Sequence, residues 1–304
     1  MAAQLTLVTP DDAVQRGLDG ADLRAARSAG DLVRIRVGAY ASAETWQGLD
    51  DAERYRLRVL AAGRRLRRPL FSHDSAAALW RLPRIGRWPQ VVHVTVPHAV
   101  GGRSSRGVRR HQVPALPRHL VAMDGVRATG AARTVVDVAR SWSFAAGLVA
   151  ADHALRESWA TADRLAGELA AIGPGRGVWA GRRVIDAASD AAESVGESLS
   201  RARMIELGLP LPKLQHEVED GDGLIGRVDF WWESLGLVGE FDGRLKYRVA
   251  GIPDTRAVEE RVWAEKQRED RLRSLGLRVV RWTWDSALDP VRFAAHLDAA
   301  GVRP

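Results

Sequence analysis

The sequence contains no cysteine, and only three of its 45 basic residues are lysines. Without cysteine there can be no disulfide, thiolate zinc site or cysteine nucleophile, so any metal must be held by oxygen or imidazole ligands. The chain also has no run of about eighteen apolar residues and no signal-peptide pattern at its start. We therefore expect a cytoplasmic protein that does not associate with a membrane.

Basic and acidic residues are unevenly distributed along the 304 residues. Residues 1–118 contain 20 arginines and 10 acidic side chains, whereas residues 191–304 contain 17 basic and 20 acidic side chains. A basic front half beside a slightly acidic rear half indicates that the front half meets a polyanion, with nucleic acid as the leading candidate. The alternative is a general preference for arginine on solvated surfaces.

The first 48 residues have the pattern of a winged helix-turn-helix. Short helices are predicted at 11–16 and 21–29, separated by a glycine-containing turn and followed by a strand at 32–37. Arg24 and Arg27 share one face of the second helix, and Arg34 and Arg36 share one face of the strand. These four arginines are our candidate DNA-binding residues, although similar helix pairs also occur in proteins that bind nothing.

Residues 49–190 predict a mixed α/β region followed by helices. A helix is expected at 50–66, strands at 91–96, 108–113 and 120–128, and four helical segments between 131 and 190. The histidines of this region lack the spacing of metal ligands, so we interpret them as ordinary surface or packed residues. A domain boundary is expected at 188–192.

Residues 191–304 predict the element order αβββαβ, with a central hairpin formed by 227–232 and 237–242. If the connection 233–236 is symmetric, Asp229 lies directly opposite Glu240, and Asp242 shares the face of Glu240. Like charges opposed across a sheet are destabilising, so the cluster needs compensation. Mg²⁺ or Mn²⁺ would supply it; the alternative is an ion pair with an arginine such as Arg227 or Arg244.

The motifs of this last region resemble the Vsr-like branch of the PD-(D/E)XK nuclease superfamily. The likeness covers about residues 193–300 and rests on a helix glutamate, the strand Val228-Asp229-Phe230, the strand end Glu240-Phe241-Asp242-Gly243, the charged helix 265–270, and the strand 277–282. It implies a restriction-endonuclease-like core in which Asp229 and Glu240 bind the metal and Glu197 completes the site. It also implies a metal-dependent deoxyribonuclease.

The sequence departs from this superfamily at one position, because Asp242 stands where the pattern has lysine. Lys246, near the strand end, would be the replacement in the catalytic set; Lys266 and Arg268 on the following helix are possible auxiliary residues. Asp242 would alternatively bind a second cation.

Residues 5–190 resemble the AbiEi-type antitoxin regulators, through Ser72-His73-Asp74-Ser75, Val92-His93-Val94-Thr95 and Ala132-Arg133-Thr134-Val135-Val136-Asp137. We thus predict an α/β (α+β) protein with three domains: a winged helix at 1–48, an AbiEi-like domain at 49–190 and a nuclease-like domain at 191–304. Two functions follow as hypotheses. One is a DNA endonuclease; the other is a transcriptional repressor whose inactive nuclease-like domain binds a toxin or a second copy.

Overall fold

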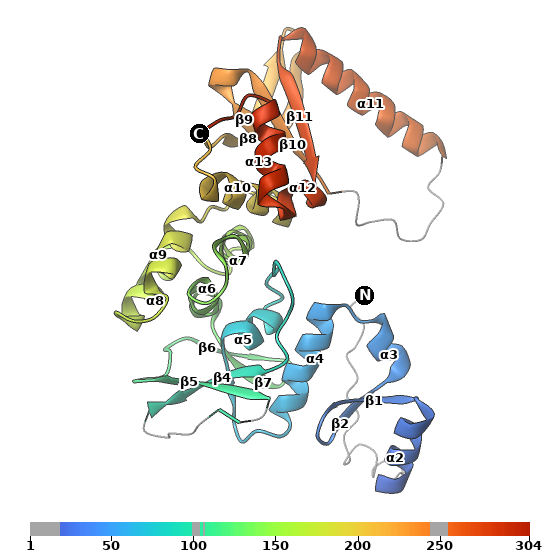
Figure 1. The fold of residues 1–304 in the computed structure, drawn as a ribbon, viewed down its shortest axis with the longest axis vertical. Helices are drawn as coiled ribbons and strands as arrows, with labels where there is room; N and C mark the ends of the chain where they lie inside the picture. Colours follow the sequence, from blue (N-terminus) through green and yellow to red (C-terminus); the bar gives the residue numbers. More distant parts are fainter. Residues whose placement is uncertain (1–18, 99–103, 106, 244–254) are drawn as a thin grey trace. The chain divides into compact units, whose positions relative to one another are not determined.

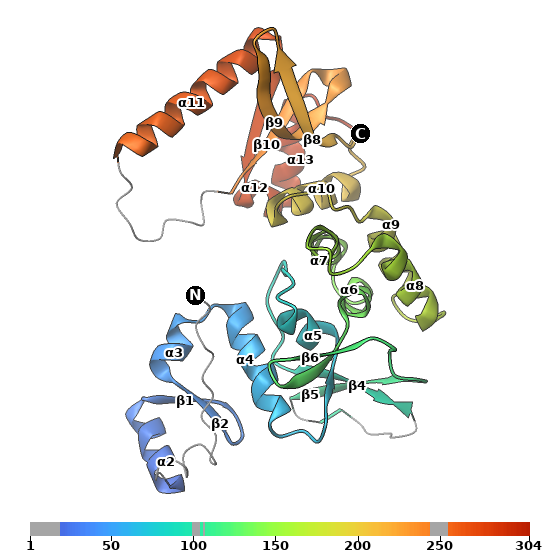
Figure 2. The ribbon, with the colours of Figure 1, turned by 180° about the vertical axis from the view of Figure 1, so that it is seen from behind.

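The computed structural model describes residues 19–98, 104–105, 107–243 and 255–304, which form two compact units (Figures 1 and 2). The first unit combines the chain up to Trp142 with Trp159–Ile185. The second combines Ser143–Ser158 with Asp186–Pro304. Each unit has its own sheet and is described separately below. The helix expected at 11–16 lies outside the described residues.

The first unit begins with helix α2 (Gly20–Ala29), the hairpin β1 (Leu32–Arg36) and β2 (Ala39–Ser42), and helix α3 (Ala43–Gly48). Asp19 caps α2 through a reciprocal capping box with Asp22, and Gly30 ends the helix in the left-handed conformation. The helix and strand expected at 21–29 and 32–37 are therefore confirmed, and the second half of the hairpin is added.

A five-stranded mixed sheet with strand order β5-β4-β3-β7-β6 follows in the same unit. Its strands are β3 (Leu70–Phe71), β4 (Val92–Pro97), β5 (Val108–Val113), β6 (Leu120–Met123) and β7 (Val126–Thr129). The single strand expected at 120–128 is wrong. Asp124 and Gly125 both have positive φ, 50° and 76°, and this tight turn folds the segment into the antiparallel pair β6–β7.

The helices of the first unit are α4 (Asp51–Gly63), α5 (His73–Leu79), α6 (Ala131–Ala139), α8 (Ala162–Ile172) and α9 (Val178–Ala187). Helix α4 bridges the hairpin and the sheet. On one side its Leu57 and Ala61 pack with Ala39 and Ala41 of β2, and on the other side the Tyr55 hydroxyl contacts the Ser75 hydroxyl of α5 at 3.0 Å. Through these contacts the β1–β2 hairpin and the five-stranded sheet belong to one compact unit.

The second unit contains a four-stranded sheet of order β11-β10-β9-β8, in which only the β10–β11 pair is parallel. Its elements are α7 (Phe144–Arg156), α10 (Val195–Glu206), β8 (Lys213–Asp220), β9 (Gly223–Trp232), β10 (Leu237–Asp242), α11 (Thr255–Ser274), β11 (Arg278–Thr283), α12 (Trp284–Leu288) and α13 (Pro290–Ala299). The expected order αβββαβ is confirmed from α10 to β11, and α12 is an added short helix.

Helix α7 is counted with the second unit, not with the first, because its contacts run to α10. Asp152 on α7 accepts two hydrogen bonds from the guanidinium of Arg201 on α10, at 2.8 and 2.9 Å, and both side chains are buried. Asp152 also accepts from the backbone of Ser189. This buried ion pair holds the two helices together, while the Nε of Arg201 is buried without a hydrogen-bond partner.

The sheet of the second unit has a hydrophobic cluster that includes α11 and a buried aromatic group. Leu272 of α11 packs with Val218, Val228 and Val238. The Trp282 ring lies 5.1 Å from Phe230 and 5.6 Å from Phe293 of α13, and its indole N–H donates to the Ser200 hydroxyl of α10 at 2.7 Å. The hydrophobic cluster and the aromatic residues hold β9, which carries Asp229, and β10, which carries Glu240 and Asp242.

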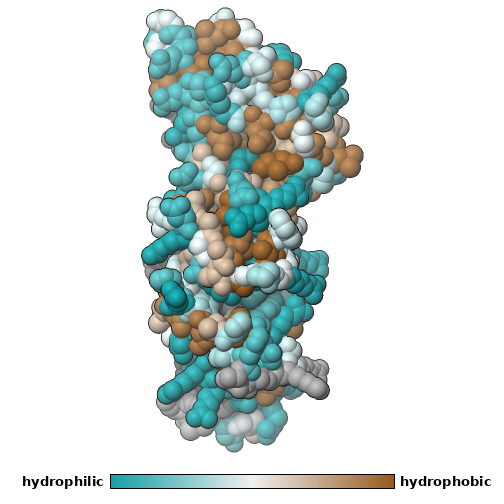
Figure 3. All heavy atoms as spheres, turned by 90° about the vertical axis from the view of Figure 1, so that its left-hand side faces the viewer, coloured by the Kyte–Doolittle hydropathy of each residue, from teal (hydrophilic) through white to brown (hydrophobic). Residues whose placement is uncertain are grey.

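No helix within the described residues is both long and apolar enough to cross a membrane. On the face drawn in Figure 3, hydrophobic side chains occur in separate groups between hydrophilic ones. Such scattered apolar groups are ordinary for the surface of a folded chain.

Candidate functional site

The hairpin of β9 and β10 has the register that the sequence predicts. Leu237 pairs with Trp232 and Gly239 with Phe230, the last pair of this ladder. Asp229 and Glu240 are the next residues of the two strands. The Asp229 carboxylate turns back to the neighbouring strand, where its Oδ2 accepts a hydrogen bond from the backbone N–H of Phe241 at 2.8 Å. The symmetric connection therefore brings the two acidic residues to adjacent strand positions.

Glu197 approaches the same place from helix α10. Its Oε2 accepts from Gln215 Nε2 at 2.7 Å and from the backbone N–H of Glu193 at 2.9 Å, and the residue is only 6% exposed. The backbone N–H of Glu197 in turn donates to the hydroxyl of Ser194, the residue that caps the helix. The side chain thus both completes the helix start and faces the sheet.

Repulsion among these carboxylates shows in the acidity of Asp229. Its pKa is raised to about 6, first by burial and then by the negative charges of Glu197 and Glu240, while the hydrogen bond from Phe241 acts in the opposite direction. A carboxylate pKa displaced by burial and like charges is typical of functional sites, although structural ion-pair networks produce the same effect.

Glu240 is held by two guanidinium groups. Arg268 Nη1 of α11 donates to Glu240 Oε1 at 2.6 Å, and Arg281 Nε of β11 donates to Oε2 at 2.8 Å. Arg281 also donates to Glu269 at 2.5 Å. The sequence singled out Arg268 as an auxiliary residue but missed Arg281, which lies directly beside Glu240 in the parallel β10–β11 register.

The described carboxylates do not fit a divalent cation as they are placed. Both oxygens of Glu240 accept from arginines, and no group of three acidic, histidine or cysteine residues in the described part of the chain is arranged to hold a metal ion. Asp242 lies half-buried at the end of β10, and Lys266 is exposed on α11. Lys246 and Arg244 lie outside the described residues. The Mg²⁺ or Mn²⁺ site therefore stays a prediction.

Three histidines that the sequence treats as unrelated meet in the first unit. The rings of His73 and His111 stack with centroids 3.6 Å apart, and His93 Nδ1 lies 3.2 Å from His111 Nε2. Two of these side chains come from the neighbouring parallel strands β4 and β5, and His73 begins α5 with φ 49°. These three histidines are packed side chains, as the sequence allows, and the pairing of distant strands brings them into one cluster.

Buried carboxylates accompany this histidine cluster. Asp74 Oδ2 lies 3.4 Å from His93 Nδ1, and Asp137 Oδ2 lies 3.6 Å from His73 Nδ1. Burial is the main cause that lowers the pKa of His73 and of His111 to about 3. The rings are therefore neutral at ordinary pH, and the cluster forms a polar core beneath the sheet.

The four arginines predicted to meet DNA divide into two groups. Arg24 and Arg27 on α2 and Arg34 on β1 are exposed and form no hydrogen bond or ion pair with any described residue. Arg36 instead donates to the backbone oxygen of Gly107 at 3.0 Å. A register shift lies between Arg34 and Arg36, and of the two only Arg34 is fully exposed.

The described chain is a mixed α/β protein of two compact units, and the carboxylate cluster lies in the second unit. The chain belongs to the family of two Mycobacterium tuberculosis proteins, "Uncharacterized protein Rv2248" of strain ATCC 25618 / H37Rv and "Uncharacterized protein MT2308" of strain CDC 1551 / Oshkosh. It is 31% identical to each over 214 residues, which is 69% of this chain and 74% of theirs.

Two other comparisons do not identify a family. No family model matches the chain. The crystal structure of the RV2827C protein from Mycobacterium tuberculosis aligns with a TM-score of 0.37 and 20% identity, over 71% of this chain and 84% of that one.

Proposed function

We propose that this protein binds duplex DNA through α2 and the β1–β2 hairpin and acts as a regulator of the antitoxin type. In this proposal the nuclease-like unit is not catalytic and serves association with a partner. The observation that carries the proposal is that Arg24, Arg27 and Arg34 are exposed and form no ion pair with any described carboxylate. Backbone hydrogen bonds lower the pKa of the Asp19 carboxyl, and Arg24 lies near enough to add to this effect. Exposed guanidinium groups outside ion pairs, on a helix and a neighbouring hairpin, are what contact with phosphates requires.

In the second unit, by contrast, many arginines form ion pairs with carboxylates. Among them are Arg201, Arg203, Arg227, Arg268, Arg271, Arg273, Arg281 and Arg303. Positive charge in that unit is thus neutralised within the fold. A polyanion would be attracted more strongly to the front of the chain, where the charge is open.

The basic segment after α4 extends the same surface. Arg65 lies against the turn of the hairpin, since its Nη1 is 2.7 Å from the place that a Cβ on Gly38 would take. Arg67 and Arg68 follow and are exposed. Arg65 therefore lies beside the hairpin, where it and the two exposed arginines that follow would add phosphate contacts to those of α2.

The arrangement of the carboxylates supports a second unit without hydrolytic activity. Glu240 is engaged by Arg268 and Arg281, which together occupy both of its carboxylate oxygens. The position where the superfamily has lysine is Asp242. Each of these features works against metal-assisted phosphodiester cleavage.

DNA binding can be tested by fluorescence anisotropy on the full chain, with duplex DNA from upstream of its own coding region and an unrelated duplex of equal length. We expect tighter binding of the upstream duplex and a steep loss of affinity with salt. Replacement of Arg24, Arg27 or Arg34 by alanine should each reduce the slope of log K against log salt by about 1. Arg303→Ala, whose guanidinium is paired with Asp298, is the matched control and should leave the slope unchanged.

The absence of catalysis has its own test. Supercoiled plasmid incubated with the protein and Mg²⁺ or Mn²⁺ should remain intact. Cleavage that disappears in Asp229→Ala would instead establish the nuclease hypothesis for the second unit. Unchanged DNA affinity in the triple variant of Arg24, Arg27 and Arg34 would refute the assignment of the binding surface.

A further inference from the structure

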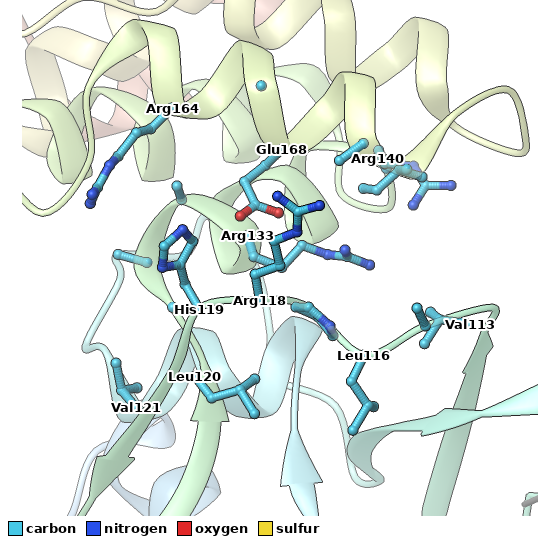
Figure 4. Close-up of a pocket in the computed structure, with 18 of the residues that line it drawn as sticks. Val113, Leu116, Arg118, His119, Leu120, Val121, Arg133, Arg140, Arg164 and Glu168 are labelled. Atoms are coloured by element: carbon cyan, nitrogen blue, oxygen red, sulfur yellow. The ribbon is translucent and has the colours of Figure 1, made fainter.

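A cavity of about 1150 Å³ lies within the first unit, between the segment that leads into β6, helix α6 and helix α8 (Figure 4). Its wall joins residues that are far apart in the sequence, among them Trp80, Arg118, Gly130, Arg133 and Glu168. The volume lies somewhat above the range of about 300–1,000 Å³ that is usual for small-molecule sites. The proposal made above for DNA binding does not use this cavity.

Positive charge gathers on the cavity wall from three directions. Arg118 comes from the segment before β6, Arg133 from α6, Arg140 from the position that ends α6, and Arg164 from α8 (Figure 4). Arg118 and Arg164 are exposed and form no ion pair with any described residue. Several guanidinium groups facing one hollow attract an anion and are only partly compensated by the acidic residues of α8.

Arg133 is the buried member of this group, with 8% of its surface exposed. Its Nε donates to Asp137 Oδ1 at 2.9 Å, and among the described residues its terminal nitrogens have no hydrogen-bond acceptor. These nitrogens are not among the buried side-chain atoms that lack a partner in the described residues, so they are open to the cavity and can donate to water or to a ligand. The terminal nitrogens of Arg133 can thus donate hydrogen bonds to a ligand in the cavity.

The start of helix α6 lies at the same wall. Gly130 caps this helix without any side-chain hydrogen bond, and Gly130, Ala131 and Ala132 all line the cavity. The first backbone N–H groups of a helix lack partners within the helix and favour negative charge. These donors and the Arg133 guanidinium would together surround one anionic group.

The rest of the wall is apolar or acidic. Trp80 and Trp159 lie with ring centroids 5.5 Å apart, and Leu116 is exposed towards the same region. Glu168 of α8 also lines the cavity, half-buried and without an ion pair to any described residue. Apolar rings suit an organic body, while Glu168 opposes excess negative charge in the ligand.

From these contacts we infer that the cavity binds a small organic anion, whose charged group meets Arg118, Arg133 and the start of α6 and whose apolar part lies against Trp80. The charged group is a phosphate or a carboxylate. The ligand is a small molecule rather than nucleic acid, because the site is a hollow in one unit and lies apart from the arginines of α2.

Isothermal titration calorimetry on the full chain, without DNA, tests this inference with three probes. Inorganic phosphate supplies charge alone, phenyl phosphate supplies charge and a ring, and benzoate replaces the phosphate by a carboxylate. We expect saturable binding of phenyl phosphate or benzoate at least about tenfold tighter than that of inorganic phosphate, and the tighter of the two identifies the anionic group. No binding in the millimolar range, or equal binding of all three, would overturn the inference.

Two substitutions with opposite signs locate the site. Arg118→Ala should weaken binding about fivefold or more, whereas Glu168→Gln should strengthen it by a similar factor because it removes a repelling charge. Arg127→Ala, an exposed arginine of β7 outside the cavity, is the control and should change nothing. A general loss of folding cannot make one variant bind better, so equal effects of all three variants would refute the location.

Discussion

At the level of single residues, the raised pKa of Asp229 has a direct consequence for stability. The folded chain holds this proton up to about pH 6, whereas the unfolded chain releases it near 3.8. Between these values the native state binds more protons than the unfolded state, so the free energy of unfolding falls as the pH rises and stays reduced above pH 6.

Replacement of Asp229 by asparagine should therefore stabilise the protein at pH 8, because asparagine keeps the acceptor for the Phe241 N–H without the charge. We expect a gain on the order of 2 kcal/mol in the free energy of unfolding, measured by urea denaturation, and no gain at pH 4. Asp222→Asn, at an exposed position of the β8–β9 turn, serves as the control. A loss of stability at pH 8 would show that the charged form has a favourable partner.

The histidine cluster predicts the opposite dependence on pH. His73 and His111 have pKa values of about 3 in the fold, mainly through burial, whereas unfolded histidine titrates near 6.5. Below pH 6.5 the unfolded chain takes up protons that the folded chain does not, so the free energy of unfolding falls as the pH is lowered.

This loss should reach about 2 kcal/mol for each of these two histidines at pH 5 relative to pH 7.5. In His111→Gln the difference between pH 7.5 and pH 5, followed by chemical denaturation, should shrink by that amount. His98→Gln, at an exposed position, should leave it unchanged. A His111→Gln variant with the same difference as the natural sequence would show that the ring is not kept neutral by the fold.

At the level of elements, helix α10 lies very close to strand β10 at Gly196. A Cβ at this position would come within 1.9 Å of the Phe241 ring, so an alanine forces the helix away from the sheet or moves the ring. We expect Gly196→Ala to lower the free energy of unfolding by about 2 kcal/mol in thermal or urea denaturation. Gly167 in α8 has no atom within 4 Å of its Cβ position, so Gly167→Ala should be neutral or stabilising.

Local sequence patterns predict most of the helices and strands. Most of what they do not predict depends on pairing between strands that are far apart in the sequence. The register of β9 and β10 follows from a short, symmetric connection, which is why the sequence predicts the pairing of Gly239 with Phe230 and brings Asp229 near Glu240. Arg281 could not be assigned, because nothing in its own segment specifies that β11 pairs in parallel with β10. The meeting of His93 and His111 likewise depends on pairing of β4 with β5. The Asp124-Gly125 turn was available in the sequence as a turn signal but lay inside an apolar run.

At the level of the whole molecule, the chain crosses between its two units more than once. Helix α7 belongs with α10, and the Asp152–Arg201 pair is the polar part of that contact. A fragment of residues 143–304 keeps this pair, whereas a fragment of residues 187–304 leaves Arg201 buried without its carboxylate. Loss of one partner of a buried ion pair costs about 3–5 kcal/mol.

The longer fragment should therefore unfold cooperatively on heating, as followed by circular dichroism. The shorter one should melt at a clearly lower temperature or show no transition. Equal melting temperatures of the two fragments would show that α7 adds nothing to the second unit. The comparison also decides whether the boundary expected near residue 190 is sufficient for folding.

The pair of arginines on Glu240 has a consequence for how this fold can change. Arg268 and Arg281 together bring two positive charges to one carboxylate, which is the charge of a divalent ion in the same place. Replacement of both by neutral side chains would leave Glu197, Asp229 and Glu240 without counter-charge. Since the described carboxylates are not arranged to hold a metal ion, the two guanidinium groups, and not a cation from outside, supply the charge balance of this part of the sheet.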